Sequence, residues 1–171
     1  MLRESLRHCV RLVVLPVMVL GLVTGLAMTA KAETEFSAKI KTAMVAMKDK
    51  AAKLGEAKAD GSALFFGTTK MNGNYELVDS LKAEFACTAT FFVKKGDRCI
   101  RISTNVIKNG NRAVGTILDP KGAAIAAIQQ GTAFYGVVDI LGSQYDTGYE
   151  PIKNGAGEVV GVYYIGYPLA K

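Results

Sequence analysis

Residues 98–106 carry the polar side chains best suited to bind a small molecule. Apolar and polar residues alternate along this segment with a period of two, which is typical of a β-strand. In an unbroken strand Arg101, Ser103 and Asn105 share one face. A guanidinium can hold a carboxylate through two parallel N–H groups, and a hydroxyl and an amide can complete the coordination. The pattern therefore predicts an anion site centred on Arg101, and its alternative is an ordinary solvated strand face.

Further candidate contacts lie in the last third of the chain, which holds six of the seven tyrosines. A tyrosine supplies a pocket with an apolar wall and a hydroxyl group, although strands also favour tyrosine for structural reasons. We expect Tyr135 and Tyr149 to form the wall and lid of the site, and Lys153 to assist them. Asp139 could bind a ligand ammonium group or cap a turn. Arg112 is either a second anion contact or, as its loop position favours, a solvated residue.

The first 32 residues have the pattern of an export signal. Arg3, Arg7 and Arg11 precede an apolar run over residues 12–27, and small residues surround the expected cleavage point after Ala32. The alternative is an uncleaved membrane anchor, because the apolar run approaches the length of a transmembrane helix. In either case we expect the remainder, a single domain over residues 33–171, to lie outside the cytoplasm, in the periplasm or beyond.

The charge of that remainder does not indicate a nucleic-acid partner. The first 32 residues hold four of the 21 basic and one of the 15 acidic residues, which leaves 17 basic and 14 acidic residues, or +3. A surplus of this size, without a basic run, is too small to predict nucleic-acid binding.

The composition also argues against an enzyme. The only histidine is His8, inside the expected signal, so the exported domain has no imidazole base or metal ligand. Haem-attachment, phosphate-loop and metal-spaced carboxylate motifs are missing from the sequence. We therefore expect no catalysis, no cofactor and no metal. Cys87 and Cys99 are expected to be free, buried thiols, because the predicted strand register separates them by too much for a disulfide.

The order of predicted elements indicates an α+β domain. Residues 33–59 have apolar side chains at helical spacing and predict one long amphipathic helix, which packs on its own sheet or forms a homodimer. Residues 61–167 read as a short strand, a helix, a hairpin, another helix and three strands joined by short turns. A hairpin and a three-stranded meander give one antiparallel sheet covered by helices.

The last two strands are predicted to form a hairpin around Asn154–Gly157, because asparagine and glycine tolerate a positive φ. With a four-residue loop, Lys153 faces Glu158 and Tyr149 faces Val162.

Several of these segments resemble the Cache domain, the extracytoplasmic sensing module of bacterial receptors. The resemblance rests on Tyr149-Glu150-Pro151-Ile152-Lys153, on Val160-Gly161-Val162-Tyr163-Tyr164-Ile165-Gly166, and on Arg101-Ile102-Ser103-Thr104-Asn105-Val106. It extends over residues 61–167, through Arg112-Ala113-Val114-Gly115-Thr116 and an aromatic position at Tyr135. It implies a PAS-like antiparallel sheet with a long N-terminal helix on one face, and with short helices and loops over a ligand pocket on the other.

The resemblance also implies a function. We expect a stand-alone sensor for chemotaxis or signal transduction that binds a small molecule, in particular a short-chain carboxylate. Because no transmitter module follows the domain before Lys171, we expect the sensor to signal through a membrane receptor or kinase. One alternative is an interaction module of the same fold whose pocket is filled by its own side chains. The other is a membrane-anchored, dimeric sensor fragment.

Overall fold

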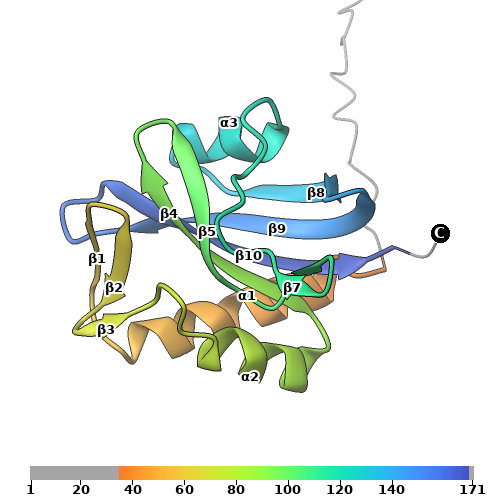
Figure 1. Cartoon of the computed structure of the whole chain (residues 1–171), viewed down its shortest axis with the longest axis horizontal. Coiled ribbons are helices and arrows are strands. Elements are labelled where there is room, and N and C mark those ends of the chain that lie inside the picture. The colour runs from red at the N-terminus through yellow and green to blue at the C-terminus, as the bar shows by residue number, and fades with distance from the viewer. Residues whose placement is uncertain (1–34, 170–171) are drawn as a thin grey trace, which may run out of the picture. The chain divides into compact units, whose positions relative to one another are not determined.

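The computed structural model describes residues 35–169, so the expected export segment, residues 1–32, lies outside the described residues. The described chain forms a five-stranded antiparallel sheet with helices on both faces (Figure 1). This is the α+β, PAS-like arrangement that the sequence predicted. Within the described part, no helix combines the length and apolar character needed to cross a membrane.

The main sheet has the strand order β5-β4-β10-β9-β8. Its strands are β4 (Thr88–Lys95), β5 (Arg98–Thr104), β8 (Phe134–Ile140), β9 (Ser143–Lys153) and β10 (Val159–Pro168). The strand in the middle, β10, is the last one along the chain and joins the β4–β5 hairpin to the β8–β9 hairpin. Side chains are buried on both faces of these central strands, because each face is covered by other elements.

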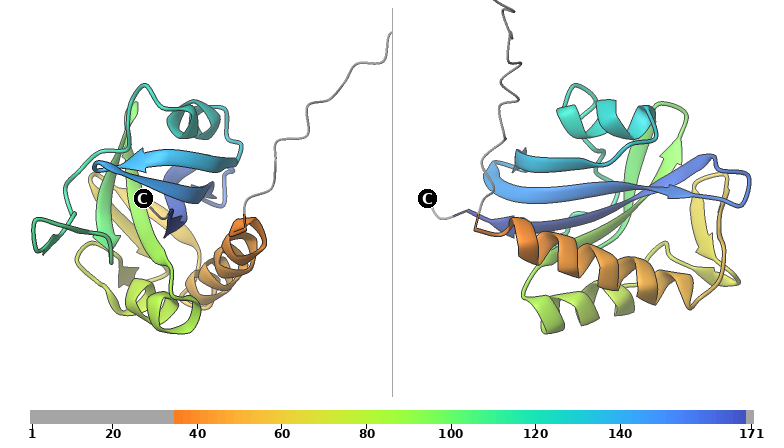
Figure 2. Two further views of the ribbon diagram at one scale, coloured as in Figure 1. Left: turned by 90° about the vertical axis from the view of Figure 1, so that its right-hand side faces the viewer. Right: turned by 180° about the vertical axis from the view of Figure 1, so that it is seen from behind.

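One face of the sheet, called the helix face below, is covered by α1 (Ser37–Ala52) and α2 (Glu76–Phe85). Figure 2 shows both helices on the same side of the sheet. The apolar stripe of α1 is buried there as the spacing predicted, through Ile40, Ala43, Met44, Met47 and Ala51. The shorter helix α2 buries Leu77, Val78 and Leu81, and it ends at Ala86, which adopts a left-handed conformation with φ 54°.

The first helix is shorter than the predicted range of residues 33–59. It begins at Ser37 and ends at Ala52, and residues 33 and 34 lie outside the described residues. Gly55 follows with φ +121°, a conformation that stops a right-handed helix. The chain then forms β1 (Ala57–Asp60), which pairs with β2 (Ala63–Phe66). The alternating alanines and charged residues of β1 fit a strand as well as a helix, so periodicity alone did not separate the two.

The opposite face, called the cavity face, is covered by α3 (Ala123–Gln129) and by residues 113–118, called the edge segment. The edge segment runs along the outer side of β5: Arg101 N–H donates to Thr116 O at 2.9 Å, and Gly115 N–H donates to Arg101 O at 2.8 Å. Within the edge segment, Ile117 forms a β-bridge with Ile100. Two small sheets complete the fold. They contain β3 (Thr69–Lys70), paired with β2, and the hairpin of β6 (Ile107–Lys108) with β7 (Asn111–Arg112).

A β-bulge in β5 changes the faces that its side chains occupy. Arg101 pairs with Phe92, whereas Ser103 pairs with Phe91, so Ile102 is an extra residue between them. Adjacent residues of β4 point to opposite faces, and Arg101 and Ser103 therefore do so as well. The prediction that Arg101, Ser103 and Asn105 share one face is wrong for this reason.

The β9–β10 hairpin also departs from the predicted register. Lys153 pairs with Val159, and Ile152 pairs with Gly161, so Val160 is an extra residue. Beyond this bulge Tyr149 lies opposite Tyr164, not opposite Val162. Asn154 organises the turn: its Oδ1 accepts hydrogen bonds from Ala156 N–H at 3.1 Å and from Glu158 N–H at 2.9 Å. The expected loop chemistry is therefore present, with one more residue in the loop.

The two thiols are free and buried, as predicted. Cys87 belongs to the core of the helix face and Cys99 to the core of the cavity face. Burial raises the pKa of each thiol to about 11, so both remain protonated at neutral pH.

The contact between α1 and the sheet depends on Gly148 in β9. A Cβ atom at this position would lie 2.7 Å from Tyr135 Cε1 and 2.8 Å from Ile40 Cγ2. We expect Gly148→Ala to lower the free energy of unfolding by about 1–3 kcal/mol, because the packed helix must shift. Urea unfolding followed by circular dichroism measures this change. Unchanged stability would contradict the close packing of α1 on β9.

Candidate functional site

Arg101 is held on the cavity face of β5 with only part of its hydrogen-bonding capacity used. Its side chain is 4% exposed, and Nη1 donates to Thr116 Oγ1 at 2.9 Å. The guanidinium carbon lies 5.1 Å from the centre of the Phe92 ring, within the range of a cation–π contact. Within residues 35–169, Nε has no hydrogen-bond partner and no ion pair includes Arg101. The guanidinium is therefore anchored on one side and available on another.

Tyr149 in β9 is fully buried on the same face. Its ring packs at a 5.0 Å centroid distance from Tyr164 and at 6.3 Å from Phe134. Its hydroxyl group has no hydrogen-bond partner among the described residues, whereas the Tyr164 hydroxyl lies 3.1 Å from Thr88 Oγ1. Buried polar atoms are nearly always hydrogen-bonded, and Arg101 Nε and the Tyr149 hydroxyl, both on the cavity face, have no partner among the described residues.

Arg101 and Tyr149 line the same cavity, whose volume is about 350 Å³. It lies between the sheet, the edge segment, the loop before α3 and the β8–β9 turn. Its remaining walls are mostly apolar: Ile117, Leu118, Ala124, Val138, Ile140 and Leu141. Gly122 and two exposed carboxylates, Asp119 and Asp139, complete the lining. A small apolar cavity with a few polar groups is the usual form of a ligand site.

The ionisation of these groups suits the binding of an anion. Burial lowers the pKa of Arg101, while the neighbouring Tyr164 and Tyr149 raise it. The guanidinium remains charged at neutral pH, because its ordinary pKa lies above 12. Burial raises the pKa of Tyr149, and the Arg101 charge opposes this effect. The Tyr149 hydroxyl is therefore protonated and can donate a hydrogen bond.

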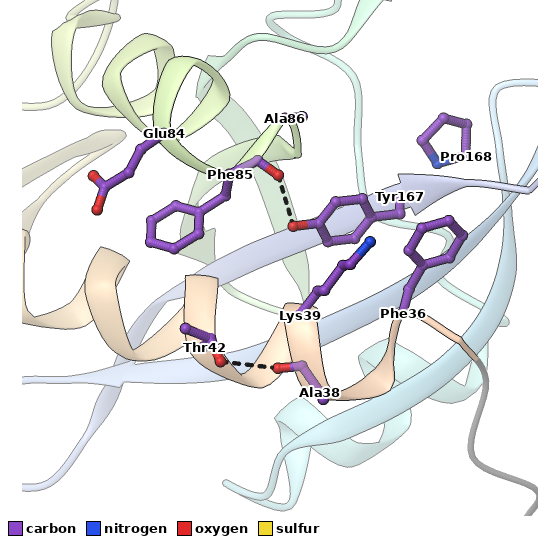
Figure 3. Close-up of a pocket in the computed structure, with 9 residues that line it drawn as sticks. All are labelled: Phe36, Ala38, Lys39, Thr42, Glu84, Phe85, Ala86, Tyr167 and Pro168. Atoms are coloured by element: carbon purple, nitrogen blue, oxygen red, sulfur yellow. Dashed lines mark hydrogen bonds between the residues drawn. The ribbon is translucent and has the colours of Figure 1, made fainter.

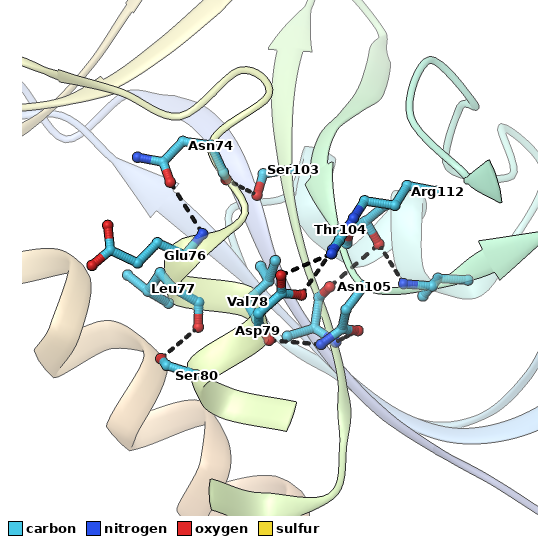
Figure 4. Close-up of polar contacts among 12 residues, drawn as sticks. Asn74, Glu76, Leu77, Val78, Asp79, Ser80, Ser103, Thr104, Asn105 and Arg112 are labelled. Carbon is cyan, nitrogen blue, oxygen red and sulfur yellow. Dashed lines mark hydrogen bonds and ion pairs between the residues drawn. The ribbon is translucent and has the colours of Figure 1, made fainter. Parts of the chain in front are cut away.

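Ser103 and Asn105 do not join this cavity. Figure 4 shows both side chains bonded to the α2 region: Ser103 Oγ donates to Asn74 O, and Asn105 Nδ2 donates to Val78 O at 2.6 Å. Asn105 Oδ1 also accepts the Ala89 N–H at 2.8 Å. These bonds fix the start of α2 and the end of β5 against β4, so both residues have structural roles in place of the expected ligand contacts.

Tyr135 lies on the helix face, not in the wall of the cavity. Its hydroxyl donates to Glu150 Oε1 at 2.5 Å, and Glu150 Oε2 is 2.7 Å from Lys48 Nζ of α1. Burial and the bond to Glu150 raise the pKa of Tyr135. Alternation along β8 explains the difference, because Phe134 faces the cavity side and its neighbour must face α1.

Of the two remaining predicted site residues, Lys153 lies outside the cavity lining and Asp139 lies within it. Lys153 is exposed at the end of β9, close to Gly131 after α3, and is not part of the cavity lining. Asp139 does line the cavity, and its Oδ1 accepts the Gly142 N–H at 2.8 Å, which is the turn-capping role considered for it. The predicted residues that the structure brings together are thus Arg101, Tyr149 and Asp139.

Arg112 is half-exposed and is not among the residues that line the cavity. It forms a two-pronged ion pair with Asp79, with both N···O distances at 2.8 Å, and its Nη1 also donates to Thr104 O at 2.8 Å (Figure 4). The Tyr75 ring lies 4.3 Å from its guanidinium carbon. The residue therefore ties the β6–β7 hairpin to α2.

A larger groove, of about 660 Å³, lies between the start of α1, the end of α2 and the end of β10 (Figure 3). Its hydroxyl groups are already bonded: Tyr167 donates to Phe85 O at 2.9 Å, and Thr42 donates to Ala38 O at 3.0 Å. Phe36 and Tyr167 stack on each other with centroids 4.9 Å apart. This groove lacks the unsatisfied buried polar atoms of the Arg101 cavity, which makes the cavity the better candidate for recognition.

A model of the Cache 3/Cache 2 fusion domain matches residues 23–171, which is most of the chain. The chain belongs to the Cache family. Cache domains are extracellular sensory modules that bind small molecules, and they are typically non-enzymatic. A comparison with curated proteins found no match.

Two solved structures are similar to this Cache domain at low sequence identity. The nlh2 GAF domain of A. aeolicus in an inactive state is 13% identical, with a TM-score of 0.44 over 77% of this chain and 83% of that chain. A protein described as a transcriptional regulator from Rhodococcus sp. RHA1 is 15% identical, with a TM-score of 0.42 over 71% of this chain and 72% of that chain.

Two residues that hold or line the cavity were not singled out from the sequence as site residues. Thr116 holds the guanidinium, yet it lies in an irregular segment without periodicity. Asp119 lies in the loop before α3, where its Oδ1 accepts the Lys121 N–H at 3.0 Å. The pairing of the edge segment with β5, which brings these residues to Arg101, has no signal in the sequence.

The two buried tyrosines should respond differently to loss of their hydroxyl groups. We expect Tyr149→Phe to leave the free energy of unfolding unchanged or to raise it by up to about 1 kcal/mol, because no bond to a described residue is lost. Tyr164→Phe should lower it by about 1 kcal/mol, because the bond to Thr88 is lost. Urea unfolding of the two variants without added ligand provides the measurement. A larger loss for Tyr149→Phe would show that its hydroxyl is structural.

Proposed function

We propose that the cavity on the sheet is the sensory site of this Cache domain, and that it binds a small molecule through a carboxylate group. The observation that carries the proposal is the buried guanidinium of Arg101, whose Nε has no acceptor among the described residues. Tyr149, whose hydroxyl also has no partner among them, lines the same cavity. Nε–H and an N–H of Nη2 lie along one edge of a planar guanidinium and match the two oxygens of a carboxylate. Nη1, on the other side, is held by Thr116.

The size of the cavity supports a short ligand. Its volume of about 350 Å³ is near the lower limit of ligand pockets. The carboxylate binds Arg101, the Tyr149 hydroxyl donates to the same group, and a short carbon chain fills the space between Leu118, Val138 and Ile140.

The burial of Arg101 also separates the sensor from the alternative interaction module. A module whose pocket is filled by its own side chains would leave Arg101 exposed or pair it with an internal acid. The side chain is 4% exposed, and among residues 35–169 it has no acidic partner. This state favours a site that is completed by a ligand.

The signal passes from the cavity to α1 and on to a partner, a membrane receptor or kinase. Tyr149 faces the cavity, and the next residue, Glu150, contacts Lys48 of α1 on the opposite face. A ligand that moves Tyr149 therefore acts on the attachment of α1, where homodimerisation would occur around the exposed Val45. The domain performs this role outside the cytoplasm, either after removal of residues 1–32 or while anchored by them.

Arg101→Met tests the sensory site. A ligand present at about one hundred times its dissociation constant adds roughly 2.7 kcal/mol to the stability of the native state, which raises the melting temperature by several degrees. We expect such a shift with at least one compound among acetate, propionate, pyruvate, lactate, amino acids and phosphate, and we expect it to vanish in Arg101→Met. Arg98→Met is the matched control, because Arg98 is exposed on the same strand. A shift that persists in Arg101→Met would refute the assignment.

Thr116 should act by positioning Arg101. Thr116→Val removes the acceptor of the Nη1–H group, and we expect it to weaken ligand binding about tenfold, or roughly 1.4 kcal/mol. Thr116→Ser keeps the acceptor and should restore most of the affinity. Isothermal titration calorimetry with the ligand found above compares the variants. Equal affinities for the valine and serine variants would rule out this role.

A further inference from the structure

Arg112 joins α2 to the end of β5. Its guanidinium forms the two-pronged ion pair with Asp79 of α2 and donates to Thr104 O of β5, with all three distances at 2.8 Å (Figure 4). The Tyr75 ring, at the start of α2, lies 4.3 Å from the guanidinium carbon. A single exposed ion pair contributes little to stability. Here two carboxylate oxygens, a strand carbonyl and an aromatic face hold one planar group, so its position is fixed.

The edge segment begins at the residue that follows Arg112. Ala113 is buried, and its N–H donates to Val106 O at 3.0 Å. Its carbonyl oxygen accepts the Thr116 hydroxyl at 2.8 Å. The same hydroxyl accepts the Nη1–H group of Arg101 at 2.9 Å. A peptide bond and two hydrogen bonds therefore connect Arg112 to the guanidinium that lines the cavity.

The edge segment needs an anchor at its first residue, because its own structure is irregular. Gly115 has φ +84°, and the segment is attached to β5 through a few backbone bonds and one isolated bridge. Val114 and Ile117 are 43% and 44% exposed, so these large apolar side chains add little burial. Segments with few buried contacts open locally at a small cost in free energy. The contacts of Arg112 oppose such opening at the end next to Thr116.

We infer that Arg112 and Asp79 form a latch through which the position of α2 controls the cavity. With the latch formed, the edge segment holds Thr116, and Thr116 holds Arg101 in its binding position. This inference rests on the proposed function and concerns the regulation of the same site. Arg112 is thus a positioning residue, which acts on the ligand only through other residues.

The latch connects the two faces of the sheet around β5. The helix α2 covers the helix face, whereas Arg101 lines the cavity on the opposite face. Coupling between two sites is reciprocal. A partner that displaces α2 therefore lowers the affinity of the cavity, and a ligand that fixes Arg101 strengthens the attachment of α2 by the same factor.

Amide hydrogen exchange of the full chain without ligand tests the latch itself. Asp79→Asn removes the charge and keeps the shape of the side chain. NMR follows the N–H groups of Gly115 and Leu118, which donate from the edge segment to β5. We expect both to exchange about tenfold faster in the variant, because local opening becomes easier. Glu76→Gln is the matched control, since Glu76 is the other acid in the first turn of α2 and is not a partner of Arg112.

Isothermal titration calorimetry tests the control of the cavity. The compounds are acetate, propionate, pyruvate, lactate and alanine, and the variants are compared with the one that binds the unaltered chain most tightly. We expect Asp79→Asn and Arg112→Met each to weaken binding about tenfold, and Arg112→Lys, which keeps the charge, to restore part of the affinity. Glu76→Gln and Lys108→Met should have no effect, because Lys108 is exposed on the same hairpin as Arg112.

A double variant shows whether the latch acts through Thr116. Thr116→Val already releases Arg101 from the edge segment, so adding Asp79→Asn should weaken binding by no more than about a further twofold. Fully additive losses would show that the ion pair supports the domain in general and does not position Arg101.

The outcomes separate this inference from the proposed function. Unchanged exchange of the Gly115 and Leu118 amides in Asp79→Asn refutes the latch, whichever compound binds. Faster exchange with unchanged affinity refutes its control of the cavity and leaves the carboxylate site in place. If no compound binds the unaltered chain, the proposed function fails and its regulation fails with it, while the exchange rates still decide whether α2 fixes the edge segment.

Discussion

The structure depends on one constraint, a buried positive charge on Arg101 that has no ion-pair partner among residues 35–169. Removing an ion from water costs several kcal/mol unless other groups compensate, and the described chain offers Arg101 a hydroxyl group, an aromatic face and no carboxylate. The elements that supply these groups come from distant parts of the sequence. β4 brings Phe92, the edge segment brings Thr116, and β9 brings Tyr149 over the same cavity.

The polar side chains on the two faces of the sheet differ in their hydrogen bonding. On the helix face, Asn105 bonds to α2 and to β4. Tyr135 donates to Glu150 of β9, which in turn pairs with Lys48 of α1. These polar contacts hold the helices in place. On the cavity face, two buried polar atoms are left open. The helix face thus has its polar groups bonded to the covering helices, whereas the cavity face keeps two buried polar atoms without partners among the described residues. Because strand residues alternate between faces, a displacement on one side reaches the other through a single peptide unit.

Much of the fold could be read from the sequence, and the limits of that reading have a physical cause. Hydrophobic spacing placed α2, α3 and the strands of the main sheet within a few residues, because each buries one regular stripe. Arg101 precedes the bulge in β5 and lies on the cavity face, whereas Ser103 follows the bulge and lies on the helix face, contrary to the expectation that the two share a face. A bulge leaves the alternation of residue types intact while it reverses the faces that they occupy. Tyr149 could be found as a strand tyrosine, whereas Thr116 and Asp119 lie in segments whose position is fixed only by tertiary pairing.

The place of β10 in the sheet sets the order in which the domain can assemble. Both outer hairpins are local in sequence, but they are joined only through this strand, and Thr88 on β4 bonds to Gly166 across 78 residues. Sheets built on such distant pairings form slowly, because a long loop must close before its contacts contribute. The ligand cavity has a floor drawn from both hairpins, so it exists only once β10 has docked. Until β10 has paired with both β4 and β9, Arg101 and Tyr149 belong to separate hairpins and cannot line one cavity.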